Sequence, residues 1–575
     1  MTGKIIEYDI DRREFLGIAG ALTGVSLAGC TGNGSTNGDT NGNGSGGGGG
    51  TGSNATVRLN VGMPAEPWNF DPALWSDTSS SIIGRLIYDE VIELSTNTKL
   101  QPGLAKSVPK SKSGGKAFEY TLRDGLTFHN GDEVTVEDFK YSVDWILNPD
   151  NNSPVRRRIP FASGTKIVDD RTLRLELSKP FTTINWWLTR GLEGIVPKGS
   201  RGSTSKGKGP SGFSTNLTRD PSGAGTGPFE FVEWKSGSHV LLKKNDDYWK
   251  DGLPKVDEIK FLFISEDATR LSKLRSGNLD LTSAIPAKDY KSMTNRPNLD
   301  GKTTAGNTTE VLYPNLMDTG NNPMANVHNR RAVLFGIDAQ EILKEIFYGN
   351  GVVQKGLWYP DSEWTSPNLK KKKLYDPEKA RAELKKAGNP DGFSLKLITT
   401  KGGHFKDEAV IIQNQLGNIG IDVEISVLEK SALFDQVYDT KDWQIALENW
   451  TNAVPVVTYW LRSGFADNNH NHVNWHHESP DLDDKYKPTG PAAPSDAKGN
   501  FSNGHEWFVK TLEKAQALDD QGKQKKIVWK LEEYLVENAI QIDIAYSNRY
   551  AVWNSDVTGF KMGKFTSDMR GASKK

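Results

Sequence analysis

Helix patterns and strand patterns alternate along most of this chain, and the alternation limits the folds that it can adopt. One helix is predicted to begin at Thr135, capped together with Asp138, and another at Asp376-Pro377, with proline at the first helical position. At 411–419 and at 527–535, apolar residues recur at helical spacing, and a strand pattern follows each stretch. Repeated helix-then-strand units predict an α/β fold with largely parallel sheets.

The N-terminal segment, residues 1–30, has the pattern of an export signal. Arg12-Arg13 precedes an apolar run at 18–27, and the small residues of Ala28-Gly29 stand directly before Cys30. A twin arginine before a modest apolar segment is typical of the export route for folded proteins. The run is too short to cross a bilayer as a helix, which needs about 20 residues. We therefore predict a twin-arginine lipoprotein signal. A lipid on Cys30 would anchor the mature chain to the outer face of the cytoplasmic membrane.

The composition of residues 31–575 limits which classes of protein this chain can belong to. Residues 31–55 are almost entirely Gly, Asn, Ser and Thr, so we predict a disordered tether. The segment that follows, about 520 residues, is long enough for two or three lobes. Lys and Arg number 71 against 72 for Asp and Glu, which argues against nucleic acid as a partner. The chain has 1 cysteine, so disulfides are not expected, and no later apolar run is long enough to span a membrane. We expect a soluble, monomeric body.

Several segments match one known family, in the family's order. They are Leu86 to Asp89, Gln101 to Ser107, Tyr120 to Gly131, Gly225 to Phe229, Asn245 to Trp249, Leu274 to Asp280, Asn329 to Val333 with Gly336 to Asp338, and Tyr375 to Ala380. Through them the chain resembles the extracytoplasmic solute-binding proteins of family 5. These are the dipeptide, oligopeptide and nickel receptors of ABC importers.

The resemblance implies a type II periplasmic-binding-protein fold, in which two lobes joined by a hinge close on a ligand and an additional domain is inserted. Lobe I would combine 56–90, 225–302 and 546–575, the inserted domain would take 91–224, and lobe II would take 303–545. The implied function is capture of a small, peptide-like solute between the lobes and its delivery to ABC permease and ATPase subunits. No cofactor is implied.

Two other classes of protein compete with this interpretation. A secreted hydrolase on the same scaffold would need a nucleophile with a base, a metal set or paired carboxylates, and no motif places such groups together. His505-Glu506, for example, lacks the second histidine of a zinc-peptidase helix. A surface scaffold or sensor input is the third possibility, which a single sequence does not separate from a receptor. We predict a receptor and no enzyme.

The stretch Leu447 to Pro455 bears on the ligand. In the resembled peptide receptors, an aspartate three residues beyond a tryptophan commonly pairs with the ligand's terminal ammonium, and here that position is Ala453. A buried ammonium without a counter-charge costs several kcal/mol. Either Asp77 or Glu448 could supply the charge for a peptide. The alternative is a neutral ligand such as an oligosaccharide, for which tryptophan faces and amides are suited.

By position in the resembled family, nine residues are predicted to line the ligand site. Trp450 would supply a flat apolar wall, although plain core packing is its alternative role, and the polar groups would orient the ligand. The nine are Asn449, Trp450, Thr451, Asn452, Tyr313 and Asn315 from lobe II, and Trp75, Asp77 and Ser80 from lobe I.

A histidine cluster is the one candidate metal site in the sequence. His470, His472, His476 and His477 lie close together, but asparagines separate them and Ser479-Pro480 follows, which favours a polar loop over a helix. We predict no metal site and keep these histidines as weak candidates only.

Overall fold

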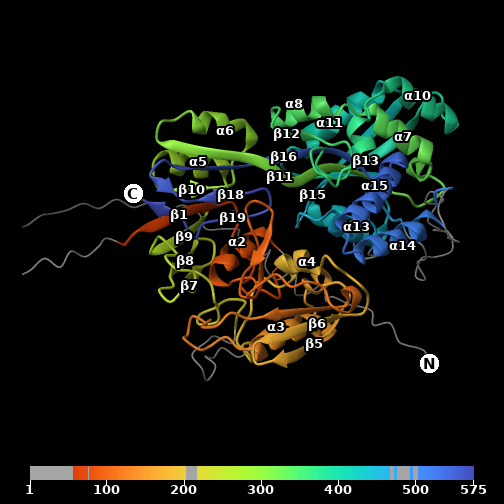
Figure 1. Cartoon of the computed structure of the whole chain (residues 1–575). Helices are drawn as coiled ribbons and strands as arrows, with labels where there is room; N and C mark the ends of the chain where they lie inside the picture. Colours follow the sequence, from red (N-terminus) through yellow and green to blue (C-terminus); the bar gives the residue numbers. More distant parts are fainter. Residues whose placement is uncertain are drawn as a thin grey trace, which may run out of the picture. The chain divides into compact units, whose positions relative to one another are not determined.

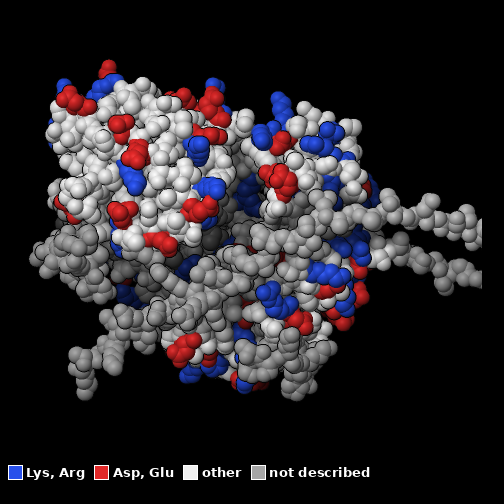
Figure 2. Space-filling model, turned by 180° about the vertical axis from the view of Figure 1, so that it is seen from behind, with Lys and Arg blue, Asp and Glu red and all other residues white. Residues whose placement is uncertain are grey.

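A computed structural model describes residues 56–75, 77–201, 216–452, 454–466, 472–475, 493–495 and 503–575. The predicted export signal with Cys30 and the whole of the predicted tether, 31–55, lie outside these residues. Within the described part of the chain, no helix combines the length and apolar character that crossing a membrane requires. On the face that Figure 2 shows, Lys and Arg side chains are interspersed with Asp and Glu.

One large mixed sheet contains 11 strands. Along the sheet, the order is β14 (Ile421–Leu428), β13 (Phe393–Thr400), β15 (Ile445–Thr451), β11 (Leu299–Pro314), β16 (Ile542–Asn554), β10 (Leu281–Thr282), β1 (Arg58–Met63), β9 (Glu258–Phe263), β8 (His239–Lys244) and β7 (Phe229–Lys235), and β12 (Gly351–Val353) pairs with β16. β11 and β16 are the long strands. Figure 1 shows β11 running from helices α5 and α6 toward the end of the sheet that carries β13 and β15.

The other strands form small sheets. They are β4 (Ala117–Thr121), β6 (Thr172–Leu177) and β5 (Ala162–Asp169) in one sheet, β2 (Ile92–Leu94) with β3 (Leu100–Pro102), β17 (Val557–Thr558) with β20 (Ser573–Lys574), and β18 (Lys561–Met562) with β19 (Ser567–Asp568).

The α-helices pack around these sheets. They are α2 (Thr78–Ile87), α3 (Val136–Leu147), α4 (Ile184–Gly191), α5 (Asp267–Arg275), α6 (Ala287–Thr294), α7 (Val327–Gly336), α8 (Ala339–Phe347), α9 (Pro367–Lys371), α10 (Pro377–Lys386), α11 (Phe405–Gly417), α12 (Lys430–Phe434), α13 (Val457–Phe465), α14 (Gly504–Gln516) and α15 (Gln521–Glu537).

The helices predicted from local signals are confirmed. Thr135 and Asp138 form a reciprocal capping box at the start of α3, which buries Phe139, Val143 and Ile146. The side chain of Asp376 caps α10 and Pro377 occupies its first turn. Helices α11 and α15 are each followed by a strand of the large sheet, β14 and β16.

The expectation of largely parallel sheets is wrong. Only β1 with β9 and β10, and β13 with β14 and β15, pair in parallel within the large sheet. β11 and β16 run antiparallel to each other through its middle, and β7, β8 and β9 form an antiparallel meander at one edge. A helix-then-strand pattern shows that a strand follows a helix, but it does not show which strand becomes its neighbour.

β11 and β16 extend through both halves of the large sheet, the half with β13, β14 and β15 and the half with β1 and β7 to β10. β16 pairs with β10 at one end of its length, and β11 pairs with β15 at the other. The predicted lobe boundaries at 303 and 546 fall inside these two strands. Because only these long strands and the segments beside them link the halves, they are the natural place for a hinge. The boundaries themselves stay a prediction.

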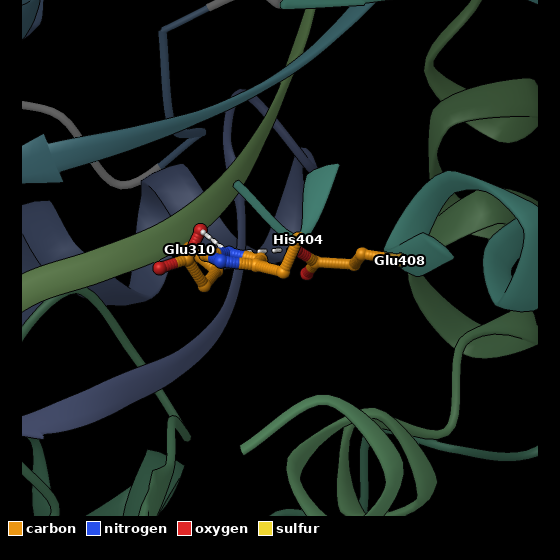
Figure 3. A group of neighbouring side chains, drawn as sticks. All are labelled: Glu310, His404 and Glu408. Carbon is orange, nitrogen blue, oxygen red and sulfur yellow. Dashed lines mark ion pairs between the residues drawn. The ribbon is translucent and has the colours of Figure 1, made fainter. Parts of the chain in front are cut away.

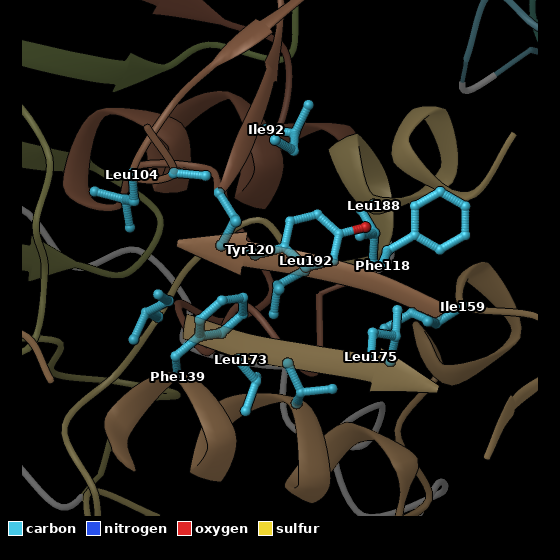
Figure 4. Packing of buried hydrophobic residues seen from close by; sticks show 14 of the residues in the cluster. Ile92, Leu104, Phe118, Tyr120, Phe139, Ile159, Leu173, Leu175, Leu188 and Leu192 are labelled. Atoms are coloured by element: carbon cyan, nitrogen blue, oxygen red, sulfur yellow. The ribbon is translucent and has the colours of Figure 1, made fainter. Parts of the chain in front are cut away.

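The segment 91–224 supplies most of the residues of one apolar core. Phe118 and Tyr120 of β4 pack with Leu173 and Leu175 of β6 and with Phe139 of α3 (Figure 4). Val454, Val456 and Tyr459 from the predicted second lobe join this cluster, so the inserted segment is packed against the rest of the chain through apolar contacts.

Candidate ligand-binding site

A cavity of ≈ 820 Å³ opens beside helix α2. Its walls come from α2 and the end of β1, from the segments around β2 and α4, from the C-terminal stretch 560–570, and from the adjoining ends of β11 and β15. Three of the nine predicted ligand residues line it: Trp75, Asp77 and Thr451. A volume of this size suits a ligand of several residues or rings, because small-molecule pockets usually enclose about 300–1,000 Å³.

Asp77 is one of the residues that line this cavity. It is the N-cap of α2, and its Oδ1 accepts a hydrogen bond from the Ser80 backbone N–H at 2.8 Å. Its Oδ2 is buried and has no hydrogen-bond partner among the described residues. One oxygen therefore holds the helix, and the other remains for a ligand donor.

Ser80 supports this segment rather than lining the cavity. It is fully buried, and its hydroxyl accepts hydrogen bonds from the backbone N–H groups of Trp68 at 2.9 Å and Asn69 at 3.3 Å. These bonds fix the loop that precedes Trp75.

Trp75 forms a fixed wall of the cavity. Its side chain is fully buried, and its ring lies so close to Gly84 of α2 that a Cβ there would meet the ring at 2.0 Å. Its indole N–H donates to Glu193 Oε2. Only glycine at position 84 leaves room for the ring, so α2 and Trp75 position each other.

Glu193 joins Trp75 to a buried ion network. Its Oε1 pairs with Arg85 at 2.5 Å and with Arg190 at 3.1 Å, and Arg85 also pairs with Glu90 at 2.8 Å. Burial raises the pKa of Glu90 to about 8, although Arg85 opposes this shift. The network lines the cavity with charges that are already paired with one another.

A second ion network lies around Glu93. This carboxylate pairs with Lys250 at 2.5 Å and with Arg570 at 3.2 Å, and burial raises the pKa of the neighbouring Asp89 to about 6. Asp89 accepts hydrogen bonds from the Tyr248 hydroxyl and the Trp249 indole.

Two arginines on the cavity have no carboxylate partner among the described residues. Arg158 donates to the Arg190 carbonyl at 3.0 Å, and Arg549 donates to the Gly563 carbonyl at 2.9 Å. Since backbone carbonyls do not neutralise a guanidinium, both side chains can receive a ligand carboxylate.

On the strand β15, neighbouring predicted residues face opposite ways. Thr451 pairs with Thr308 of β11, with the two hydroxyl oxygens 2.9 Å apart, and both residues line the cavity. Successive side chains of a strand point to opposite faces, so Trp450 faces away from Thr451 and Asn449. The Trp450 ring is half-buried against Trp460 and His472, and Asn449 is exposed.

The other predicted residues of lobe II are buried inside it. Asn452 donates to the Tyr546 hydroxyl at 3.0 Å, and its Oδ1 has no partner among the described residues. Asn315 donates to the Trp443 carbonyl at 2.8 Å, and the Tyr313 ring packs against His472. None of these three lines the cavity. The structure gives them packing and loop-holding contacts, and their contact with a ligand stays a prediction.

Of the four clustered histidines, only His472 is among the described residues. Its Nδ1 is hydrogen-bonded with the Tyr438 hydroxyl, and its ring lies between Tyr313 and Trp450. His470, His476 and His477 lie outside the part of the chain that the structure describes. For His472 itself, the contacts are those of a packed core histidine.

A sequence profile described as bacterial extracellular solute-binding proteins, family 5, matches residues 99–472. The chain belongs to this family. The predicted family is therefore confirmed, and with it the place of the protein among the substrate-binding proteins of ABC importers, which work outside the cytoplasm.

Individual relatives agree with this assignment. This family 5 protein is 26% identical to the oligopeptide-binding protein OppA of Bacillus subtilis over 429 residues, which cover 69% of this chain and 75% of OppA. It is 28% identical to the glutathione-binding protein GsiB of Salmonella typhi over 372 residues, covering 62% of this chain and 67% of GsiB.

Solved structures show the same fold. The periplasmic binding protein AgaA of A. tumefaciens R10, in complex with agropinic acid, matches with a TM-score of 0.71 and 23% identity, covering 90% of this chain and 99% of AgaA. DppA of Helicobacter pylori, in complex with the peptide STSA, matches with a TM-score of 0.71 and 23% identity, covering 90% of this chain and 98% of DppA. The predicted α/β periplasmic-binding-protein fold is confirmed.

The sequence alone did not indicate several residues of the cavity in this family 5 protein. Arg158, Glu193 and Arg549 come from segments far apart in the chain, and none belongs to a motif that singles it out. The contacts that make them notable are all tertiary, so no local signal could have identified them.

Proposed function

We propose that this protein binds peptides with a free amino terminus in the cavity beside α2 and delivers them to an ABC permease and its ATPase. The observation that carries the proposal is Asp77, a residue of the cavity wall whose Oδ2 is buried and has no partner among the described residues. A ligand ammonium would satisfy this oxygen. OppA is named as an oligopeptide-binding protein, and the DppA structure contains the peptide STSA. Both support peptides as the ligand class.

Asp77 is a better counter-charge than Glu448. Glu448 is buried on the Trp450 face of β15, is not part of the cavity lining, and has a pKa that burial raises to about 7. It would therefore be partly protonated near neutral pH. Asp77 lies at the N-terminus of a helix, where a carboxylate is stabilised by the helix dipole.

The opposite end of a peptide also has partners in the cavity. Arg158 or Arg549 can pair with the ligand carboxylate, and the hydroxyls of Thr308 and Thr451 can bond to its amide groups. Closure of the lobes about β11 and β16 would bring Asn449, which shares the face of Thr451, nearer to the bound ligand. Ser80, Tyr313, Asn315 and Asn452 would then hold the elements that carry the site.

The location of the protein is part of the same proposal. We propose export by the twin-arginine route and a lipid on Cys30, with the Gly-rich segment 31–55 as the tether. A receptor held at the membrane surface in this way would stay within reach of its permease. We also propose that the protein is a monomer and makes or breaks no bond in its ligand.

Isothermal titration with a tripeptide and its N-acetyl derivative tests the ligand class. Asp77→Asn keeps the helix cap, because Asn caps as well as Asp, but removes the charge. Losing a hydrogen bond between charged groups costs about 1.5–3 kcal/mol, so the affinity of the variant for the free-amine peptide should fall by roughly ten- to hundredfold. The acetylated peptide should bind weakly to both proteins and should not distinguish them.

Asp520→Asn is the matched control. Asp520 caps α15 by accepting from the Lys523 N–H at 3.0 Å, and it does not line the cavity. Its replacement should leave the affinity unchanged. Equal peptide affinity in wild type and Asp77→Asn would contradict the assignment of Asp77. Binding of oligosaccharides with no response to any peptide would favour the neutral-solute alternative.

A further inference from the structure

Two glutamates and a histidine, Glu310, Glu408 and His404, meet in the lobe that carries β11 (Figure 3). Glu310 comes from β11, His404 immediately precedes α11, and Glu408 lies in the first turns of that helix. His404 Nε2 lies 3.2 Å from Glu310 Oε2 and 3.5 Å from Glu408 Oε2. One ligand atom from each residue lies within 4.8 Å of the other two.

Local structure explains why these groups converge. His404 and Glu408 are four residues apart at the start of a helix, so their side chains lie on the same face. The rings of Phe347 and Phe405 pack against the imidazole with centroid distances of 4.9 and 4.7 Å. These contacts limit the rotation of the imidazole and direct its Nε2 toward the carboxylates.

The charge of this cluster is not balanced. The side chains of Glu310 and Glu408 are 1% and 0% exposed. Among the described residues, neither oxygen of Glu408 nor Oε2 of Glu310 accepts a hydrogen bond, and no Lys or Arg pairs with either carboxylate. Two buried carboxylates beside a single imidazole leave negative charge uncompensated, which is costly in a low-dielectric interior.

We propose that Glu310, His404 and Glu408 bind a divalent first-row metal ion, with Zn²⁺ the best match. Imidazole nitrogen and carboxylate oxygen are both ordinary zinc ligands. In a tetrahedral site with bonds of about 2.0–2.2 Å, neighbouring ligand atoms lie about 3.4 Å apart. The two distances from His404 Nε2, 3.2 and 3.5 Å, fit this geometry, and the third edge, within 4.8 Å, would close by up to about 1.4 Å on binding. A divalent ion neutralises both carboxylates.

A water molecule would complete the coordination of the ion. The His404 side chain is 31% exposed, but its Nε2 and both oxygens of Glu408 are buried, so the ion itself would be enclosed. The ion would join β11 to α11 in a region where Glu310 pairs directly with Asn449 of β15. It would therefore stiffen the strand pair that also carries Thr308 and Thr451 at the cavity. The proposal does not depend on which solute the cavity binds.

The test uses the mature chain after treatment with a chelator and dialysis, with Zn²⁺ alone as the probe. Metal content by mass spectrometry should show one equivalent per chain, and Zn²⁺ should raise the melting temperature. Glu408→Gln and Glu310→Gln should each weaken Zn²⁺ binding at least a hundredfold. A Co²⁺-loaded sample should show the absorption of a tetrahedral site, which His404→Gln should abolish.

Two control variants make the result specific. His328→Gln alters another histidine–glutamate pair of the same lobe, in which Glu383 is also neutralised by Lys386, and it should bind Zn²⁺ like wild type. The triple variant His470→Gln, His476→Gln and His477→Gln should also retain the metal. Loss of binding in this triple variant with retention in Glu408→Gln would overturn the proposal.

The competing explanation is a carboxyl pair that shares a proton, without any metal. In that case Glu408→Gln would raise the melting temperature of the chelator-treated protein, and Zn²⁺ would have no effect on wild type. Either failure of wild type to retain Zn²⁺ or equal retention by Glu408→Gln would refute the metal site.

Discussion

Glu193 is predicted to be among the most sensitive positions for stability. Its carboxylate is 1% exposed, pairs with Arg85 and Arg190, and also accepts from the Trp75 indole. Breaking a buried ion pair by removing one partner costs about 3–5 kcal/mol, because the other charge stays buried. Glu193→Gln keeps the shape and can still accept from Trp75. We therefore expect the free energy of unfolding to fall by about 3 kcal/mol, the lower end of this range.

The expected change in melting temperature follows from the size of the folded part. An unfolding entropy of about 2.1 cal/mol/K per residue over about 520 residues gives about 1.1 kcal/mol/K, so a loss of 3 kcal/mol lowers the melting temperature by about 3 °C. Differential scanning calorimetry without ligand measures this shift. Glu429→Gln is the control, because its partner Lys401 and Glu429 itself are 71% and 69% exposed, and no shift is expected. A Glu193→Gln protein that melts at the wild-type temperature would refute the reasoning.

Three further predictions address pH, anchoring and the role of Trp450. Because burial raises the pKa of Glu90 from 4.5 to about 8, the folded state binds a proton more tightly than the unfolded state does. The free energy of unfolding should therefore fall as pH rises from 4.5 to 8, and Glu90→Gln should flatten this fall in melting curves recorded across that range; an unchanged slope would contradict the shift. Cys30→Ala should release the protein from membranes while leaving its melting temperature unchanged, and membrane association that persists after a high-salt wash would contradict lipidation at Cys30. Trp450→Ala should destabilise the fold by about 3 kcal/mol, since its half-buried ring packs against Trp460, and should change the affinity little, since Trp450 faces away from the cavity; a hundredfold loss of affinity would instead place Trp450 at the ligand.

Elements that depend on contacts within a few residues could be predicted from the sequence. The capping box of Thr135 and Asp138 and the Asp376-Pro377 start are complete within one helical turn. Gly420, directly after the apolar pattern at 411–419, adopts a positive φ of 95° between α11 and β14. These features needed no knowledge of the rest of the chain.

β11 shows what the sequence could not reveal. The first part of this strand, Leu299 to Thr309, contains few apolar residues and has no clear alternation. It is extended because β16 pairs with it over most of its length, and β16 lies more than two hundred residues later in the chain. Separation in sequence also hid the proposed metal cluster, since Glu310 and His404 are 94 residues apart and meet only in the folded chain. The one local signal was the spacing of His404 and Glu408, which is common on helices that bind no metal.

The alternation of β11 relates the cavity to the proposed metal site. Thr308, Glu310 and Leu312 share one face of the strand, opposite Thr451, Asn449 and Leu447 of β15 in unbroken register. Thr308 lies on the cavity, Glu310 carries the unbalanced charge, and Leu312 enters the apolar core that contains α11. The other face carries Val311 and Tyr313 into a second core, in which Trp450 is packed. A change in the backbone of this strand pair cannot move Thr308 without also moving Glu310, because only one residue separates them. Ligand binding and metal binding would therefore be coupled through a rigid, two-residue connection, and any such coupling must act equally in both directions.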